Sequence, residues 1–515
     1  MIPRNISLSR SKIAVSIALL ATSFLASAQQ TTVTDSDLSK SIQELRDQVQ
    51  QLRAAVSEIK SEAAEYRAEN QELRKELETI RATPGPSQAK PAEAGSVPGS
   101  TVAAGATAEE RVSSLEENTQ LEQSQLRTLY QTKIESASKY RMRLSGMVLL
   151  NLFHNQGPVD NLDVPTYASP TGPYGIAPTF GATMRQSELG LEVFGPQVAG
   201  AKTRGEVQMD FGGGFPSGAL DGINTGVVRL RTADLRLDWQ NTSIVAGQDS
   251  LFISPNSPTS FASLLVPSLG YSGNLWAWTP QLRVEHKFDI AEGQNISVAA
   301  GILDNVTGET SYGSHRLPQA GESSGQPAYA VRTAWNSTVG DRPLILGASG
   351  YYSRQNWGFD WTVDGWAASV DWRVPLPSRL ELSGEFYRGR AIGGLGGGIG
   401  QSVLFSGSPS NPLSDFRPVN SAGGWSQLKL SATSRLEFNA AAGIDNPFAS
   451  DVRAYTSPIG VYPSVLEANR SAMLNFVFRP RSDLLLSGEY RHLRTSQLGT
   501  FFGADNVNLT MGVLF

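Results

Sequence analysis

Charged side chains alternate with apolar ones at many places after residue 140, and their types favour anion chemistry. Between residues 203 and 212, Arg204, Glu206 and Asp210 fall on one phase of the alternation, with Val207 and Met209 on the other. An arginine guanidinium binds a carboxylate or a phosphate through two parallel hydrogen bonds. We therefore predict a wet surface that favours small anions. The residues predicted to line it are Arg204, Glu206, Asp210, Arg229, Arg231, Arg236, Arg283, Glu285, Arg332 and Arg373.

A second interpretation of the same charges stays open. The arginines could pair with neighbouring acids, such as Asp234 and Asp371, and serve only to satisfy a polar wall. The formal net charge of the 515-residue chain is −5, so positive charge is not in excess. The same balance excludes a basic nucleic-acid-binding domain, and we expect no nucleic acid partner.

Catalytic chemistry has little support in the sequence. The chain has no cysteine, which excludes disulfides and thiolate sites, and it has only four histidines. None of the histidines stands in a motif that pairs a base with a nucleophile. We therefore predict no catalytic residue, no metal site and no cofactor. A barrel enzyme is the least favoured alternative.

The elements that must position the charged residues are β-strands. Trp366, Ala368 and Val370 share one phase of a period-two pattern, while Asp371 and Arg373 share the other. Such alternation is typical of a strand with one polar and one apolar face. Sixteen runs of this kind begin near residues 141, 183, 201, 225, 242, 277, 294, 327, 342, 361, 379, 422, 434, 469, 482 and 505.

The lengths of the runs and of their connections indicate a membrane barrel. Many runs reach the roughly 9–11 residues of a tilted membrane strand. Short connections, as at 240–241, alternate with long ones, as at 212–224 and 390–421. Outer-membrane barrels have this arrangement and an even strand number. We predict an all-β transmembrane barrel of about 16 antiparallel strands over residues 140–515, wide enough for an aqueous channel. Aromatic residues near the run ends predict an interfacial girdle of Trp239, Phe288, Trp335, Tyr351, Tyr352, Trp357, Trp361, Tyr387, Trp425 and Tyr490.

Both ends of the chain carry further signals. Basic residues, an apolar segment and a small-residue cleavage site predict a signal peptide over residues 1–28. At the other end, Val507, Leu509, Met511, Val513 and Phe515 alternate up to the terminal residue. That ending resembles the carboxy-terminal signature of bacterial outer-membrane proteins, which implies recognition by the outer-membrane assembly machinery through Phe515.

The region before the strands has a heptad pattern. Apolar residues repeat at spacings of 4 and 3 over residues 29–81, which predicts a coiled coil preceding the barrel. Basic e positions and acidic g positions pair only when the helices are parallel, and Asn70 fixes the register. The heptads alone leave dimer and trimer open. We predict that the following residues hold the oligomer together: Ile42, Leu45, Val49, Leu52, Val56, Ile59, Asn70, Leu73 and Leu77. A linker rich in proline, alanine and glycine over 82–108 and a second amphipathic helix over 109–139 follow.

One long connection has a mixed character. Residues 254–276 are semi-apolar and contain Pro255, Pro258 and Pro267. This segment could fold into the barrel as a constriction or lie on the rim as an ordinary loop.

Several motifs together resemble the DcaP-like family of trimeric outer-membrane porins. They read RQSELGLE (185–192), GEVQMDF (205–211), VVRLRTADLRLDW (227–239), AGQDSLF (246–252) and TPQLRVEHKF (279–288). The phosphate-selective porin family has a similar layout and is the nearest rival. The sequence departs from the family pattern at Glu188, where a basic residue usually follows the RQS motif.

This resemblance implies a homotrimer in the bacterial outer membrane, with the coiled coil in the periplasm. It implies passive diffusion of small hydrophilic solutes, above all small anions such as carboxylates or phosphate, with outer-membrane lipid around the barrel. The main alternative is a structural tether, in which the coiled coil reaches toward the cell wall and the barrel only anchors it.

Overall fold

The computed structural model describes residues 141–170, 178–214, 226–309, 316–453, 465–497 and 499–515. The predicted signal peptide, coiled coil, linker and second helix, over residues 1–139, lie outside the described residues and stay predictions. None of the described helices is long and apolar enough to cross a membrane.

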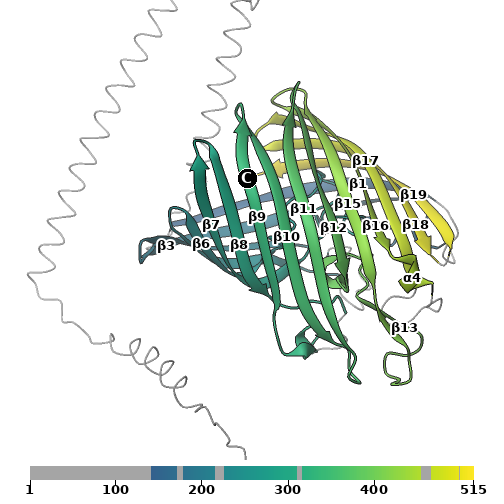
Figure 1. The fold of residues 1–515 in the computed structure, drawn as a ribbon. Coiled ribbons are helices and arrows are strands. Elements are labelled where there is room, and N and C mark those ends of the chain that lie inside the picture. The colour runs from purple at the N-terminus through teal and green to yellow at the C-terminus, as the bar shows by residue number, and fades with distance from the viewer. Residues whose placement is uncertain (1–140, 171–177, 215–225, 310–315, 454–464, 498) are drawn as a thin grey trace, which may run out of the picture. The chain divides into compact units, whose positions relative to one another are not determined.

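The regular secondary structure of the described chain is almost entirely β (Figure 1). The first strands are β1 (Arg141–Gln156), β2 (Thr179–Thr183), β3 (Glu188–Val198), β4 (Ala201–Asp210), β5 (Arg229–Asp238), β6 (Thr242–Ser250), β7 (Trp278–Ala291), β8 (Gln294–Leu303), β9 (Ala328–Val339) and β10 (Arg342–Asn356). They are followed by β11 (Thr362–Leu376), β12 (Leu380–Arg390), β15 (Asn420–Ser431), β16 (Leu436–Pro447), β17 (Leu466–Arg481), β18 (Leu484–Gln497) and β19 (Thr500–Leu514). Small elements in the connections are η1 (Glu322–Ser324), η2 (Gly393–Leu395), the hairpin β13 (Val403–Phe405) and β14 (Phe416–Pro418), and α4 (Ala449–Val452).

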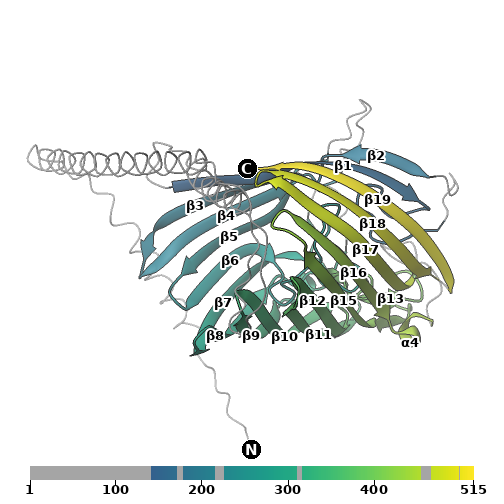
Figure 2. The ribbon, with the colours of Figure 1, turned by 90° about the horizontal axis from the view of Figure 1, so that it is seen from above.

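The strands close into a ring through hydrogen bonds between the first and last of them. β1 pairs antiparallel with β19, with Leu152 opposite Leu509, and with β3, with Leu144 opposite Leu191. All other neighbours in the ring are consecutive and antiparallel, as Figure 2 shows. β2 and β3 share one position beside β1, so the 17 strands of the sheet fill sixteen positions. The closed all-β barrel predicted from the sixteen runs is confirmed, and closure leaves no sheet edge without partners.

The shared position of β2 and β3 contains a bulge. Asn151 of β1 lies opposite Thr183, and Met147 lies opposite Glu188. Four steps along β1 therefore correspond to five steps along its partner, and residues 184–187 leave the ladder. Bulges of this kind redirect side chains and are common in barrels and near functional sites.

Apolar residues face outward and polar residues face inward around the barrel. On β19, Val507, Leu509 and Met511 are exposed, whereas Asn508 and Thr510 between them are buried. This is the expected pattern for an apolar outer band and a polar interior. The predicted aromatic girdle is wrong at three positions, because Tyr351, Tyr387 and Trp425 are buried and face inward. These three residues lie on the inward phase of their strands. The prediction was wrong because it used only their position near the ends of the runs and not their phase.

The connections differ sharply at the two ends of the ring. Turns such as residues 199–200 and 292–293 join strands at one end, which we call the short-turn end. Connections such as 251–277 and 391–419 lie at the opposite, long-loop end. The predicted alternation of short and long connections is confirmed.

The outward phase can be tested with Leu509→Arg in the middle of β19. We expect this variant to lower the free energy of unfolding from lipid vesicles by about 2–4 kcal/mol, because an arginine near the bilayer centre must leave water. The matched control is Leu413→Arg, since Leu413 is fully exposed in a connection. Equal urea denaturation midpoints for both variants would contradict the outward placement.

Candidate functional site

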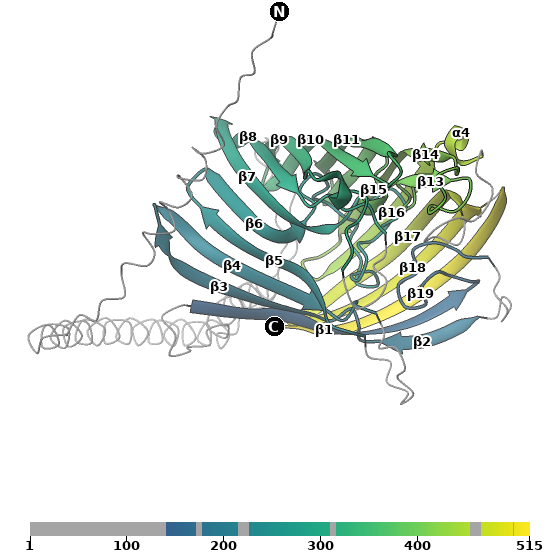
Figure 3. The same ribbon diagram turned by 90° about the horizontal axis from the view of Figure 1, so that it is seen from below.

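Residues 251–277, which connect β6 to β7, fold into the barrel, and we call them the inward loop. Seen end-on, connecting segments lie within the ring of strands (Figure 3). The hydroxyl of Ser254 donates a hydrogen bond to Glu385 on β12, and the backbone amide of Thr259 donates to Gln427 on β15 at 2.7 Å. The hydroxyl of Ser260 donates to Glu489 on β18. The sequence left constriction and rim loop open, and these contacts place the loop in the interior.

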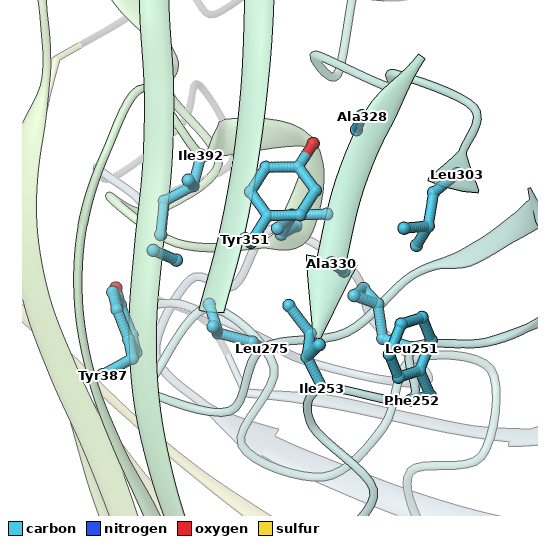
Figure 4. Packing of buried hydrophobic residues seen from close by; sticks show 12 residues of the cluster. Leu251, Phe252, Ile253, Leu275, Leu303, Ala328, Ala330, Tyr351, Tyr387 and Ile392 are labelled. Atoms are coloured by element: carbon cyan, nitrogen blue, oxygen red, sulfur yellow. The ribbon is translucent and has the colours of Figure 1, made fainter. Parts of the chain in front are cut away.

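Apolar packing holds the beginning of the inward loop against the wall. Leu251, Phe252 and Ile253 are buried against side chains of β8–β12, among them Tyr351 and Leu303. Figure 4 shows these side chains directed toward one another between the strands. Burial of apolar area stabilises the loop here even though the lumen around it is polar.

The far part of the inward loop approaches the opposite wall so closely that side chains would not fit. A Cβ atom added at Gly273 would lie 2.3 Å from the carbonyl oxygen of Gly424 on β15. A Cβ atom at Gly443 on β16 would lie 2.2 Å from the carbonyl oxygen of Ser272. Because atoms cannot approach that closely, glycine is required at both positions for this contact.

The bulge between β2 and β3 holds the middle of the inward loop. The buried amide of Gln186 donates to the carbonyl of Ala262 at 3.0 Å, and its side-chain oxygen accepts from the amide of Leu264 at 2.6 Å. The neighbouring Arg185 forms a buried ion pair with Asp163 at 2.8 Å. The RQS motif thus contributes a loop anchor rather than a charge in the channel.

A second connection also enters the barrel, and the sequence analysis missed it. The glycine-rich segment 391–402 contains η2, and Ile392, Leu395 and Ile399 in it are buried. The amide of Ile399 donates to Asp445 on β16 at 2.7 Å, and the amide of Trp276 in the inward loop donates to the carbonyl of Leu395 at 3.0 Å. The glycine run was the available signal, since Gly396, Gly398 and Gly400 have positive φ angles.

The charged residues predicted from the alternation lie on β4, β5, β7, β9 and β11. Arg204 pairs with Glu192 of β3 at 3.0 Å, and Arg229 pairs with Asp210 at 2.6 Å. Arg231 pairs with Glu188, the residue at which the sequence departs from the family pattern. A β-bulge opposite residues 208 and 209 brings Arg231 within 3.8 Å of Asp210, the carboxylate that Arg229 binds.

The other predicted residues form a second set of ion pairs. Glu285 accepts from both Arg236 at 3.1 Å and Arg283 at 2.7 Å, which joins β5 to β7. On the next strands, Arg332 pairs with Asp371 at 2.7 Å. The guanidinium of Arg373 donates to Asn256 of the inward loop at 3.1 Å. The remaining predicted residue, Glu206, accepts from Gln208.

The structure adds charged residues that the sequence analysis did not single out. Glu385, Glu489 and Arg491 are buried on the inward faces of β12 and β18 and hold the inward loop. The alternation of these residues is visible in the sequence. Their contacts with the inward loop are not, because they join residues that lie far apart along the chain. Glu192 and Asp249 likewise supply carboxylates to Arg204 and Arg283.

In several pairs the guanidinium is more exposed than its carboxylate. Exposed side-chain fractions are 27% for Arg229 against 0% for Asp210, and 34% for Arg204 against 11% for Glu192. Arg332, at 14% against 1% for Asp371, behaves in the same way. Arg236, Arg283 and, in its pair with Glu188, Arg231 are exceptions, because their carboxylate partners are the more exposed. At the pairs formed by Arg204, Arg229 and Arg332, more of the guanidinium than of the carboxylate is therefore accessible to water.

Known proteins resemble this barrel in structure. No protein-family model matches the chain, and no curated protein matches it either. The outer membrane channel DcaP of Acinetobacter baumannii has a similar structure, with a TM-score of 0.56 and 16% identity over 75% of this chain and 100% of that one. The two chains share the fold of a closed β-barrel. An anion-selective porin from Comamonas acidovorans matches at a TM-score of 0.46, with 12% identity over 73% of this chain and 100% of that one. The resemblance to DcaP predicted from the motifs is confirmed.

Removing the side-chain amide of Gln186 tests its role as an anchor of the inward loop. In Gln186→Ala the carbonyl of Ala262 and the amide of Leu264 lose their partner, and an unsatisfied buried group costs about 1–3 kcal/mol. We expect backbone amides of the inward loop to exchange hydrogen on the order of tenfold faster, measured by mass spectrometry.

The matched control is Gln248→Ala, because Gln248 also donates to backbone carbonyls, at Leu230 and Arg231, but not to the loop. Unchanged exchange in Gln186→Ala, or equal acceleration in both variants, would show that Gln186 does not anchor the loop.

Proposed function

We propose that this protein is an outer-membrane porin that lets small hydrophilic solutes diffuse passively through its barrel. The closed ring of sixteen strand positions with a polar interior, narrowed by the inward loop, carries the proposal. At about this strand number side chains do not fill the interior, so water can occupy it.

The solute path follows the wall formed by β3 to β7. The inward loop makes most of its described hydrogen bonds to other parts of the ring, including β1, β12, β15, β17 and β18. On the wall itself, Arg229 of β5 donates to the carbonyl of Leu265 at 2.7 Å. Among the described residues, no hydrogen bond joins the inward loop to Arg204, Glu206, Arg236 or Glu285. These four side chains are therefore available to water and solute beside the loop.

The proposed selectivity is for small anions such as carboxylates or phosphate. We propose that the ten charged residues predicted from the sequence to line the pore do so. The more exposed guanidinium groups of Arg204, Arg229 and Arg332 support it, because a solute meets them before it meets their carboxylates. The ion pairs orient each guanidinium and leave some of its five donors for a passing anion.

We further propose a homotrimer in the outer membrane, with the parallel coiled coil in the periplasm and Phe515 read by the assembly machinery. The backbone of Phe515 exchanges hydrogen bonds with Gly146 of β1, at 3.0 and 2.9 Å. The terminal residue therefore completes the last pairing of the ring, which supports a role for it in barrel assembly.

Selectivity is tested with full-length protein in planar lipid bilayers. We expect stepwise conductance and a reversal potential in a potassium chloride gradient that favours chloride. The double variant Arg204→Gln/Arg236→Gln should shift that potential toward potassium, since the carboxylates of Glu192, Asp238 and Glu285 would then dominate the wall.

The matched control is Arg354→Gln, which removes an outward-facing arginine and should leave the reversal potential unchanged. A silent bilayer at high salt would contradict the porin proposal. A preference for potassium in the unaltered protein would contradict only the anion selectivity.

Oligomer formation is tested by chemical cross-linking of the mature protein. We expect a trimer, and a smaller trimer fraction after deletion of residues 38–80, because that segment carries the heptads. Monomer alone in both proteins would refute the proposed assembly.

A further inference from the structure

The outward face of β12 and β15–β18 is concave, although this face points away from the lumen. A groove of roughly 690 Å³ lies there, lined by outward residues that include Phe386, Ala422, Gly424 and Ala442. A second hollow of roughly 490 Å³ adjoins it toward the short-turn end and shares Ser426, Ala442, Ala472 and His492 with it. We call the two together the outer groove. Its floor consists of small side chains and its sides of larger apolar ones.

Two arginines stand at the long-loop end of the outer groove. Arg470 of β17 and Arg494 of β18 are direct cross-strand partners, and both side chains are exposed. Like charges directly opposite each other on one face destabilise a strand pair. Among the described residues, neither guanidinium pairs with a carboxylate. Arg494 lies over the ring of Phe501 at 4.7 Å, and the nearby Asp505 is bonded to His492 at 2.8 Å.

Another outward arginine of the barrel is arranged differently. Arg354 of β10 lies opposite Asp364 of β11, so its charge has an acid as direct cross-strand partner. An acid thus lies directly opposite Arg354, whereas Arg470 and Arg494 lie directly opposite each other beside the outer groove. This contrast favours an anion from outside the protein at Arg470 and Arg494.

Arg470 and Arg494 also lie near the end of the barrel, where a lipid headgroup could reach them. Arg470 is four residues after the start of β17, and Arg494 is three residues before the end of β18, both at the long-loop end. Farther along the same faces, Leu474 and Phe476 are exposed and apolar. A ligand that lies along the groove thus meets cations at one end and hydrocarbon-like surface below.

We propose that the outer groove binds a phosphate-bearing lipid, with its phosphate between Arg470 and Arg494 and an acyl chain along the groove. This inference rests on the proposed insertion of the barrel in a membrane but not on its conductance. Guanidinium groups bind phosphate bidentately, and anionic headgroups are attracted to basic residues at a membrane surface. The chemistry selects the phosphate, and the small residues of the floor leave room for the chain.

The test uses native mass spectrometry of the full-length protein in detergent with bisphosphorylated lipid A added. We expect retained lipid adducts, and on the order of tenfold fewer of them in Arg470→Gln/Arg494→Gln, because two interfacial cations are lost. The charge-preserving variant Arg470→Lys/Arg494→Lys should retain most adducts. Arg354→Gln is the matched control and should bind as the unaltered protein does.

Each other outcome has a definite meaning. Equal retention of zwitterionic phosphatidylcholine, or equal loss in Arg354→Gln, would overturn the proposal, since the arginine pair would then confer no selectivity. Displacement of the lipid by inorganic phosphate alone would show an ion site without an acyl chain and would also overturn the proposal.

A cross-linking experiment tests whether a second copy covers the groove, and it is possible because the polypeptide has no cysteine of its own. Efficient bismaleimide cross-linking of Ala442→Cys between copies would mean that a second copy covers the groove. Heat-modifiable electrophoretic mobility verifies that each variant is folded.

Discussion

Closure of the backbone hydrogen-bond ring is the constraint on which the rest of this structure depends. A strand in hydrocarbon cannot leave its amides and carbonyls without partners, so the first and last strands must meet. They do so through the ladder between β1 and β19, which ends at the reciprocal bonds between Gly146 and Phe515. Once the ring is closed, each side chain has only two directions, and the period of two becomes a division between lipid and lumen.

The interior uses that division for two different purposes. The side of the ring that includes β12, β15, β17 and β18 presents buried polar side chains such as Glu385, Gln427 and Asn475, which hydrogen-bond the inward loop. The side formed by β3 to β7 presents paired charges such as Arg204 and Glu192 instead. Most of the loop's described hydrogen bonds go to the first side, while Arg229 on the second side donates to the carbonyl of Leu265. Arg204 and Arg236 make no described hydrogen bond to the loop, which leaves them available for the proposed solute path.

On the outer surface of the barrel, two neighbouring arginines have no carboxylate partner among the described residues. Most interior arginines have a carboxylate within ion-pair distance, whereas Arg470 and Arg494 face each other without one among the described residues. A charge left without a partner beside an apolar groove indicates a ligand that supplies it. In the interior the carboxylate partners come from the chain itself. On the outer surface the proposed lipid would supply the partner.

Alternation and connection length alone determined the sixteen strands, the closed barrel and the phase of the charged residues, because period two is a local property that each run expresses by itself. Only the tertiary structure decided which carboxylate meets which arginine, since Glu192 and Arg204 or Arg236 and Glu285 come together through strand pairing. It also decided that the inward loop enters the lumen. That outcome depends on contacts with strands that follow more than one hundred residues later, and no local pattern in the loop encodes them.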